Sequence, residues 1–244
     1  MKESAKSFPE GRPIRKFRIS STTSPGGFRG HPDPVSALDS LIYGRRSIRK
    51  YKREVPPPGM IDSMVCCALQ APSPANRQPV RFFRFCRPET LETLKIAMEE
   101  GCQARLAAAE EKGASEILKN IIVNYHRFLL FMFDAPLLFA VGTVPAQRSV
   151  AERLASSGIT ARRGRTASDD DLSVGMAVME WMLKGEELGL GSCILTAPLL
   201  YLDRPEEILG ISPVTIKCFL TLGFPDETPA PRKKKSVSDI YREL

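Results

Sequence analysis

The sequence predicts an α+β fold, in which helices pack on one sheet. Helical and strand-like stretches alternate along the chain, but unevenly, and few of the strand-like stretches have the length of buried parallel strands. One segment, Leu172 to Leu188, is apolar on more than one face, which is typical of a helix buried in a core or in a subunit interface. The chain has 244 residues, of which 43% are hydrophobic, enough for one sizeable core.

The character of the chain changes near residue 33. Residues 1–32 are rich in Ser, Gly, Pro and Arg, which predicts an irregular basic extension ahead of a folded domain over residues 33–244. Asp33 and Pro34 are typical of a helix start. Apolar residues follow at helical spacing and Gly44 is a typical stop, so we expect the first helix to end there.

The next third of the chain is predicted to be mostly helical. Three prolines at 56–58 precede a second helix, which must end before Pro72 because proline disfavours helix at the residue before it. Its apolar stripe comprises Ile61, Met64, Val65, Ala68 and Leu69. Val80 to Cys86 alternates like a strand. Residues 89–133 are expected to be helical, with a break near Gly113.

The remaining elements follow in order. Leu137 to Val141 is an apolar run typical of a buried strand, and residues 145–170 predict a long loop or short helices that act as a lid. After the apolar helix, Ser192 to Leu195 predicts a strand, Asp203 to Glu206 a helix start, and Val214 to Leu222 the last strand. The tail is rich in proline and then basic.

Charge leaves two classes of function open. The net charge is +7, and residues 1–34 hold seven basic against three acidic residues. A second basic cluster lies at Arg232 to Lys235. A nucleic-acid-binding surface would explain this distribution. A solvated tail combined with an anion-binding site explains it equally well, and we favour the second interpretation.

Other features argue for a cytoplasmic protein without a metal or a membrane span. No run of about 18 apolar residues occurs, and the basic N-terminus is not followed by the apolar core of a secretory signal. The six cysteines form no Cys-x-x-Cys pair and most lie in apolar stretches, which is typical of reduced, buried thiols. With only His31 and His126 available, we expect no zinc site, and we interpret His126 as a core or interface residue.

Two polar segments are the candidate ligand-binding elements. The run Arg45 to Tyr51 clusters cations and one hydroxyl just after the expected first helix, and Ala71 to Pro79 is a proline-punctuated loop with Ser, Asn and Gln. Arginine forks match phosphate and carbonyl oxygens, and the neutral polar groups can bond the edge of a ring. Either segment alone is also typical of a surface loop. Together they predict a site for a phosphorylated, flat ligand with polar edges.

The two segments resemble the opening signature of the nitroreductase family of FMN-dependent oxidoreductases. That signature is a helix, then Arg-Arg-Ser-x-Arg-x-Tyr/Phe, and further along Pro-Ser-x-x-Asn-x-Gln-Pro leading into a strand. Gly185 to Cys193 resembles the helix-to-strand element of the family, and Leu222 to Pro225 with the basic tail resembles its closing segment. The likeness spans about residues 35–240, with all four pieces in the right order.

The resemblance implies a central, mostly antiparallel sheet flanked by helices, assembled as an intertwined homodimer with FMN at the subunit interface. Arg45, Arg46 and Ser47 match the positions that hold the ribityl chain and phosphate, and Arg49 matches the cation near the flavin N1/O2 edge. Pro72, Ser73, Pro74 and Asn76 match the loop contributed by the second subunit, and Gln78 is a further cofactor-binding candidate. Leu195, Thr196 and Ala197 would present backbone to the ring. Arg232 and Lys234 would clamp the phosphate, with Lys235 as the alternative to Lys234.

The predicted function is an FMN-dependent oxidoreductase that takes a hydride from NADH or NADPH and reduces a nitroaromatic, a quinone or a related small acceptor by ping-pong exchange. No side chain need act as a dedicated acid or base, because the flavin carries the chemistry. Two alternatives remain open: a basic nucleic-acid-binding module and a flavin-binding protein without turnover. A further hypothesis is that Arg162, Arg163 and Arg165 admit an anionic substrate or the NADPH phosphate, although a solvated loop is the simpler interpretation.

Overall fold

The computed structural model describes residues 36–145, 150–159 and 169–243. The described residues fall into a main unit, within Pro34–Arg232, and a separate C-terminal segment from Lys233. The expected boundary at residues 32/33 and the arginines at 162–165 lie outside the described residues.

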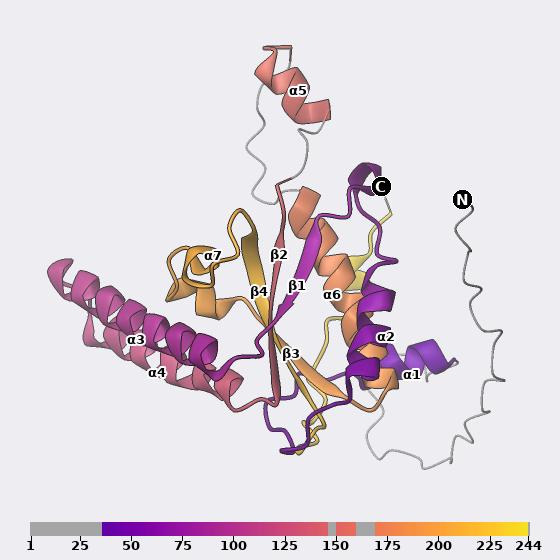
Figure 1. Cartoon of the computed structure of the whole chain (residues 1–244), viewed down its shortest axis with the longest axis horizontal. Coiled ribbons are helices and arrows are strands. Elements are labelled where there is room, and N and C mark those ends of the chain that lie inside the picture. Colours follow the sequence, from indigo (N-terminus) through magenta and orange to yellow (C-terminus); the bar gives the residue numbers. More distant parts are fainter. Residues whose placement is uncertain (1–35, 146–149, 160–168, 244) are drawn as a thin grey trace, which may run out of the picture. The chain divides into compact units, whose positions relative to one another are not determined.

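The main unit is built on a four-stranded sheet with the order β1-β2-β4-β3 (Figure 1). Its strands are β1 (Val80–Arg84), β2 (Leu137–Thr143), β3 (Gly191–Leu195) and β4 (Thr215–Gly223). All three pairings are antiparallel. The two central strands are the most apolar, and β2 is buried over its whole length, because helices cover both faces of the sheet. The predicted α+β class and all four predicted strands are confirmed.

The helices complete the element order. They are α1 (Ala37–Gly44), α2 (Pro58–Ala68), η1 (Pro74–Asn76), α3 (Pro88–Glu111), α4 (Glu116–Leu129), η2 (Leu130–Phe133), α5 (Val150–Ser156), α6 (Asp169–Glu187), η3 (Ala197–Leu200), α7 (Pro205–Ile208) and α8 (Val237–Ile240). The predicted break near Gly113 is confirmed, since it separates α3 from α4 and Gly113 has a φ of 64°.

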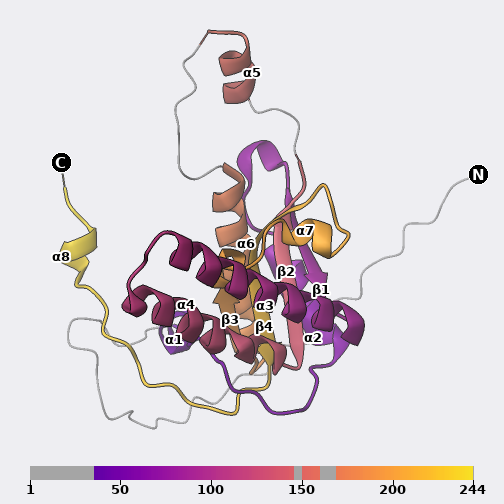
Figure 2. The same cartoon turned by 90° about the vertical axis from the view of Figure 1, so that its left-hand side faces the viewer.

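The two faces of the sheet carry separate cores. Leu137, Phe139 and Val141 of β2 point to one face, where they pack with α2 and α6 around Trp181, which has no exposed surface. The alternate residues of β2 point to the other face, which the α3–α4 pair and the η3–α7 segment cover (Figure 2). This division follows from the two-residue period of a strand.

The beginning of α1 differs from the prediction. The N-cap is Ser36, which forms a capping box with Asp39: the Asp39 N–H donates to Ser36 Oγ at 3.1 Å, and the Ser36 N–H donates to Asp39 at 3.0 Å. The predicted start at Asp33 and Pro34 lies outside the described residues. The helix ends at Gly44, as predicted.

The structure qualifies one prediction about burial and corrects two. Leu172, Met176 and Met179 on α6 are 58%, 44% and 48% exposed in the single chain, so the core buries one face of this helix, and the predicted subunit interface stays a prediction for the other face. Leu69 is 60% exposed, because α2 ends one residue earlier. Among the cysteines, which are all free, Cys66 and Cys86 are exposed, and the others are buried or half-buried. Leu69 and Cys86 lie just past the ends of α2 and β1, whereas the other exposed residues lie on the outward faces of α2 and α6.

Candidate functional site

The Arg45–Tyr51 run forms an extended segment at the end of the sheet, beyond α1. On one side, the Ile48 N–H donates to Ser192 O of β3 at 3.0 Å, and Ser47 forms a parallel bridge with Ser192. On the other side, the chain that follows β4 pairs antiparallel with it: the Lys52 N–H donates to Phe224 O at 2.9 Å. The run is therefore braced by backbone hydrogen bonds along both edges, which fixes the positions from which its side chains project.

Ile48 and Tyr51 anchor the run in the core. Ile48 is 6% exposed and lies against Gly191, where a Cβ atom would come within 2.6 Å of Ile48 Cγ1. The Tyr51 hydroxyl donates to the Ile48 carbonyl and is hydrogen-bonded to the fully buried Thr221 hydroxyl at 2.7 Å. Burial raises the pKa of Tyr51 above its ordinary value, so it stays a neutral phenol. The run thus alternates between inward anchors and outward polar groups.

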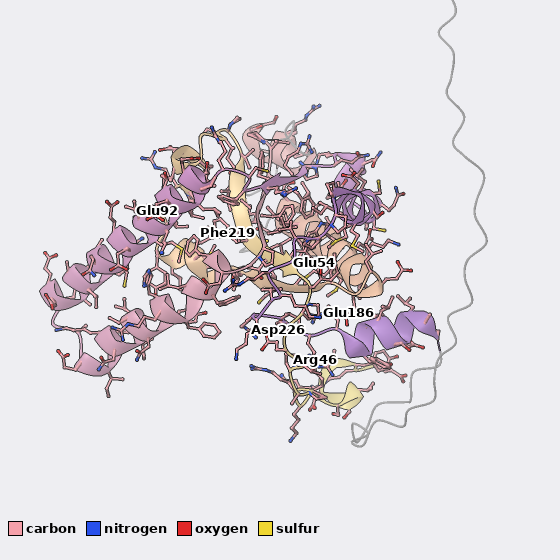
Figure 3. The ribbon with its side chains drawn as sticks, turned by 60° about the horizontal axis from the view of Figure 1, so that its bottom comes forward. Arg46, Glu54, Glu92, Glu186, Phe219 and Asp226 are labelled. Carbon is pink, nitrogen blue, oxygen red and sulfur yellow. The ribbon has the colours of Figure 1, made fainter. Side chains whose placement is uncertain are left out.

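The outward groups form a cationic cluster at one corner of the sheet. Arg45 and Arg46 act electrostatically on Glu186 at the end of α6, where burial raises the pKa of that carboxyl and the two arginines oppose the rise. Figure 3 shows Arg46 and Glu186 in the same region, near Asp226. Among the described residues, Arg45, Arg46 and Arg49 form no ion pair with a carboxylate. Their charge is therefore available to an anion.

Arg46 has a second role. Its Nη1 donates to three carbonyls at the end of α1: Tyr43 O at 2.6 Å, Gly44 O at 3.0 Å and Arg45 O at 2.9 Å. A cation at a helix C-terminus bonds the carbonyls that lack a partner within the helix and complements the helix dipole. Nη1 of Arg46 is therefore engaged within the chain, and its other N–H groups are the ones that can bind a ligand.

Arg49 has hydrogen-bonding capacity that the described residues do not use. Its guanidinium carbon lies 5.6 Å from the centroid of Phe128 and 5.9 Å from that of Phe131. Its Nη1 reaches Ser47 O only at 3.3 Å, and its buried Nε has no hydrogen-bond partner among the described residues. A buried donor without an acceptor costs free energy, on the order of 1–3 kcal/mol. This donor set suits a ligand with acceptor oxygens or nitrogens, such as phosphate or the pyrimidine edge of a flavin.

The Pro72–Gln78 segment forms a tight turn that leads into β1. The Gln78 N–H donates to Ser73 Oγ at 2.9 Å, and Gln78 Nε2 donates to Asn76 Oδ1 at 3.0 Å. Ala75, Asn76 and Gln78 have φ values of 51°, 53° and 48°, in the left-handed region that non-glycine residues seldom adopt. Residues held there mark a functional constraint more often than chance. Asn76 and Gln78 are exposed.

An ion pair attaches this turn to α6. Arg77 Nη2 lies 2.9 Å from Asp170 Oδ1, and both side chains are mostly buried. Asp170 stands in the first turn of α6, where an acidic residue complements the helix dipole. The turn is thus fixed to the same helix whose exposed face carries Leu172 and Met176.

Within one chain, the arginine run and the Pro72–Gln78 turn stand at opposite corners of the sheet. The turn enters edge strand β1 at Val80, which is level with Thr143 of β2 and Thr215 of β4. The run pairs with Ser192 of the other edge strand, β3, which is level with Leu222 at the opposite end of β4. From ordinary strand spacing and rise, the corners are on the order of 25 Å apart. Figure 1 shows the same separation, with the turn between α2 and β1 at the upper end and the segment after α1 at the lower end.

The other predicted site residues lie at different places. Leu195 ends β3 and is buried, and Thr196 and Ala197 turn the chain into η3. This segment shares edge strand β3 with the arginine run, but lies at its other end. Arg232 is exposed at the end of the main unit, and Lys234 and Lys235 are exposed in the C-terminal segment. Their part in the site stays a prediction.

Comparison with known proteins identifies the family. The profile of the nitroreductase family matches residues 42–224, which is most of the chain. The chain belongs to the nitroreductase family. This confirms the family indicated by the two polar segments, and it includes both of them in the matched region.

Individual relatives are distant but match along nearly their whole length. A protein named NADH dehydrogenase from Thermus thermophilus is 27% identical over 216 residues, covering 85% of this chain and 96% of the relative. Among solved structures, a BluB-like flavoprotein from Clostridium difficile superposes with a TM-score of 0.72 at 24% identity, covering 86% of this chain and 99% of that chain. The FMN-dependent nitroreductase NfnB from Mycobacterium smegmatis, solved with NADPH, has a TM-score of 0.60 at 17% identity, covering 85% and 98%. These structures confirm the nitroreductase fold.

Several residues near the run of this nitroreductase-family chain were not identified from the sequence. Glu227 accepts hydrogen bonds from the backbone of the run, and Phe128 and Phe131 lie under Arg49. Cys193 lies beneath the run, where burial raises its pKa against the opposing effects of Arg49, a hydrogen bond from Ser47, and Arg45. Cys193 ends the Gly185–Cys193 segment that the sequence singled out. Glu227, Phe128 and Phe131 meet the run through tertiary packing alone.

The described residues hold neither a membrane-spanning helix nor a cluster of metal ligands. No helix there is both long and apolar enough to cross a membrane. No group of three His, Cys, Asp or Glu side chains in the described part of the chain is placed to hold a metal ion. His126 is 3% exposed and lies edge-on to Tyr201, with Nε2 lacking a hydrogen-bond partner among the described residues and 3.8 Å from Glu99 Oε2. That position fits a core residue.

Proposed function

We propose that this chain is an FMN-dependent oxidoreductase that uses NADH or NADPH and acts as a homodimer. The single observation that carries the proposal is the cationic corner: Arg45, Arg46 and Arg49 are held on a braced segment, form no ion pair with a described carboxylate, and include a buried guanidinium nitrogen without an acceptor. Family membership supports FMN, because NfnB is described as FMN-dependent and a structural neighbour is described as a flavoprotein.

The residues divide the work of binding. Arg45, Arg46 and Ser47 would hold the phosphate and ribityl chain through charge-assisted hydrogen bonds. Arg49 would face the N1/O2 edge of the flavin, where a cation stabilises the negative charge of the reduced ring. Bound FMN would supply hydride transfer between a nicotinamide and an acceptor. The chain's own groups bind and orient, and none needs to act as an acid or base.

The geometry of one chain argues for a second copy. The Pro72–Gln78 turn lies at the corner opposite the arginine run, so the two segments can contact one FMN only if the partner subunit supplies the turn. Beside the turn, Leu172, Met176 and Met179 form the apolar wall of an open groove of about 560 Å³ that Pro72 also lines. Exposed apolar patches of this kind mark interaction sites. We infer that this groove is buried in the homodimer.

The substrates would use one pocket in turn. A nicotinamide would leave before a nitroaromatic, quinone or related acceptor enters, so initial rates should give parallel double-reciprocal plots. Product-inhibition patterns that require both substrates to be bound together would contradict this ping-pong scheme. The names of the relatives favour a nicotinamide donor, since one is called NADH dehydrogenase and NfnB was solved with NADPH.

The first test is the absorption spectrum of the purified chain, with the released chromophore identified by chromatography. FMN near one per subunit is expected. The double variant Arg45→Ala/Arg46→Ala should weaken FMN binding at least tenfold, because two charge-assisted contacts are lost. Arg204→Ala, which removes an arginine 74% exposed in its side chain, is the matched control and should bind normally. A colourless protein that also fails to take up added FMN, but binds DNA or RNA with a steep salt dependence, would replace this proposal with a nucleic-acid-binding function.

A second test addresses the dimer. Met176→Glu places a charge in the groove, and should give monomers in light scattering together with loss of FMN. Ile96→Glu changes an equally exposed apolar residue, 50% exposed on α3, and should leave both the mass and the flavin unchanged. A Met176→Glu protein that remains dimeric and fully loaded would exclude the groove as the interface.

A further inference from the structure

Glu227 is the residue nearest the arginine run whose arrangement the proposed function does not use. Its Oε1 accepts hydrogen bonds from two successive backbone N–H groups, those of Arg49 and Lys50, at 2.5 Å and 3.0 Å. Two successive N–H groups directed at one point form a concave anion site. The carboxylate of Glu227 occupies that site from a position 178 residues further along the chain.

The orientation of Glu227 is informative because cations are close by. Burial raises the pKa of both Tyr51 and Cys193, and in both cases Glu227 raises it further while Arg49 lowers it, so the two charged side chains act on the same small region. Even so, Glu227 forms no ion pair with Arg49 or with another described cation. The carboxylate is directed at the backbone of the run and leaves the guanidinium of Arg49 unpaired.

The neighbouring backbone makes this arrangement rigid. The Asp226 N–H donates to Lys50 O at 3.0 Å, and Tyr51 pairs with Pro225, so Glu227 continues a short antiparallel ladder along the run. The carboxylate of Glu227 accepts the N–H groups of Arg49 and Lys50, and so fixes the backbone that carries the Arg49 side chain. The guanidinium then lies over Phe128 and Phe131 with Nε unbonded.

We propose that Glu227 is a positioning residue for FMN, which fixes the backbone of Arg49 so that its unpaired guanidinium is directed at the flavin. The proposal rests on the proposed function, since it assumes that Arg49 meets FMN. Glu227 acts as a hydrogen-bond acceptor for the backbone of the run, and its charge does not act on the flavin.

The test compares FMN affinity and the midpoint potential of bound FMN in the wild type, Glu227→Ala, Glu227→Gln and Asp226→Asn. Affinity is measured by quenching of flavin fluorescence on addition to apoprotein. Glu227→Ala removes the acceptor and should weaken FMN binding about tenfold, consistent with loss of two hydrogen bonds to a charged group. Glu227→Ala should weaken the binding of reduced FMN about tenfold more than that of oxidised FMN. This difference lowers the midpoint potential of bound FMN by about 30 mV for a two-electron couple.

Glu227→Gln separates positioning from charge. The amide oxygen can accept the same two N–H groups, so most of the affinity and potential should return. A potential that rises above the wild-type value in Glu227→Gln would mean that Glu227 acts through its charge, and would overturn the proposal. Asp226→Asn removes a neighbouring exposed carboxylate from the same turn, and should match the wild type in both measurements.

A double-mutant cycle with Arg49→Gln tests whether Glu227 acts through Arg49. If it does, Glu227→Ala should change the potential by much less in the Arg49→Gln background than in the wild type. An undiminished shift in that background would overturn the proposal, and so would a Glu227→Ala protein indistinguishable from the wild type. A wild type that binds no FMN would refute the proposed function itself, which keeps the two failures distinguishable.

Discussion

Replacing Gly191 with alanine should disturb the arginine run through a steric contact with Ile48. A Cβ at position 191 would stand 2.6, 2.8 and 2.9 Å from three carbon atoms of Ile48, where favourable carbon contacts lie at about 3.5–4.0 Å. Either β3 or the run must therefore shift by roughly 1 Å. Ile48 cannot move without a cost in free energy, because it is 6% exposed, its N–H donates to Ser192 O, and its carbonyl accepts a hydrogen bond from Tyr51.

Overpacking of a well-filled core costs about 1–3 kcal/mol. For a chain of this size, each kcal/mol lowers the melting temperature by about 2–4 °C. The assay is thermal and denaturant unfolding of Gly191→Ala, followed by titration with FMN, whose affinity should fall because Arg45 to Arg49 leave their braced positions. Gly59→Ala is the control: this exposed helical glycine has nothing within 4 Å of its added Cβ, so alanine should stabilise by about 0.5–1 kcal/mol. A Gly191→Ala protein with wild-type stability and wild-type FMN affinity would refute the claim that Ile48 anchors the run.

Three other predictions concern charge and burial. Burial raises the pKa of Cys218 to about 12 from its ordinary 9.0. The stability that the buried neutral thiol contributes is therefore complete below about pH 9 and is lost as the pH rises toward 12. Between pH 8 and 11, the denaturant midpoint of Cys218→Ala should fall less steeply than that of the wild type. Arg77→Ala breaks a mostly buried ion pair and should cost about 1–2 kcal/mol, whereas breaking the exposed Arg204–Glu207 pair with Arg204→Ala should cost less than about 0.5 kcal/mol in the same urea titration. Thr221→Val removes the buried hydroxyl that bonds Tyr51 and should cost about 0.5–1.5 kcal/mol in the free energy of unfolding; equal stability would show that the Tyr51 hydrogen bond to Ile48 O is sufficient.

Local sequence patterns predicted most of the secondary structure because they depend on nearest neighbours. Proline at 56–58 and at 72 delimited α2, and the break at Gly113 separated α3 from α4. Where the pattern left alternatives open, tertiary structure decided. Leu172, Met176 and Met179 are as apolar as the buried residues of α6, but they point away from the sheet. Composition alone gives no direction to a helix that is apolar on every side.

The candidate site could be predicted only in part. The polar residues of both segments were found because arginine, serine, asparagine and glutamine in that order carry a chemical signature. Glu227, Phe128 and Phe131 were missed, because they reach the run from distant parts of the chain and are ordinary surface or helix residues in the sequence. No local pattern distinguishes a glutamate that binds two backbone N–H groups from one that faces solvent.

The sequence by itself determined the class of fold, the order of the elements and the chemical nature of the two polar segments, because periodicity, turn residues and side-chain chemistry are local properties. The family followed from the resemblance of these segments to a known signature. Only the tertiary structure decided that the arginine run is braced between β3 and the chain after β4, that Arg49 carries a buried donor without an acceptor, and that the Pro72–Gln78 turn stands at the opposite corner of the sheet. These facts depend on strand order and register. Residues far apart in the chain set that order, through the packing of two helical layers on one antiparallel sheet.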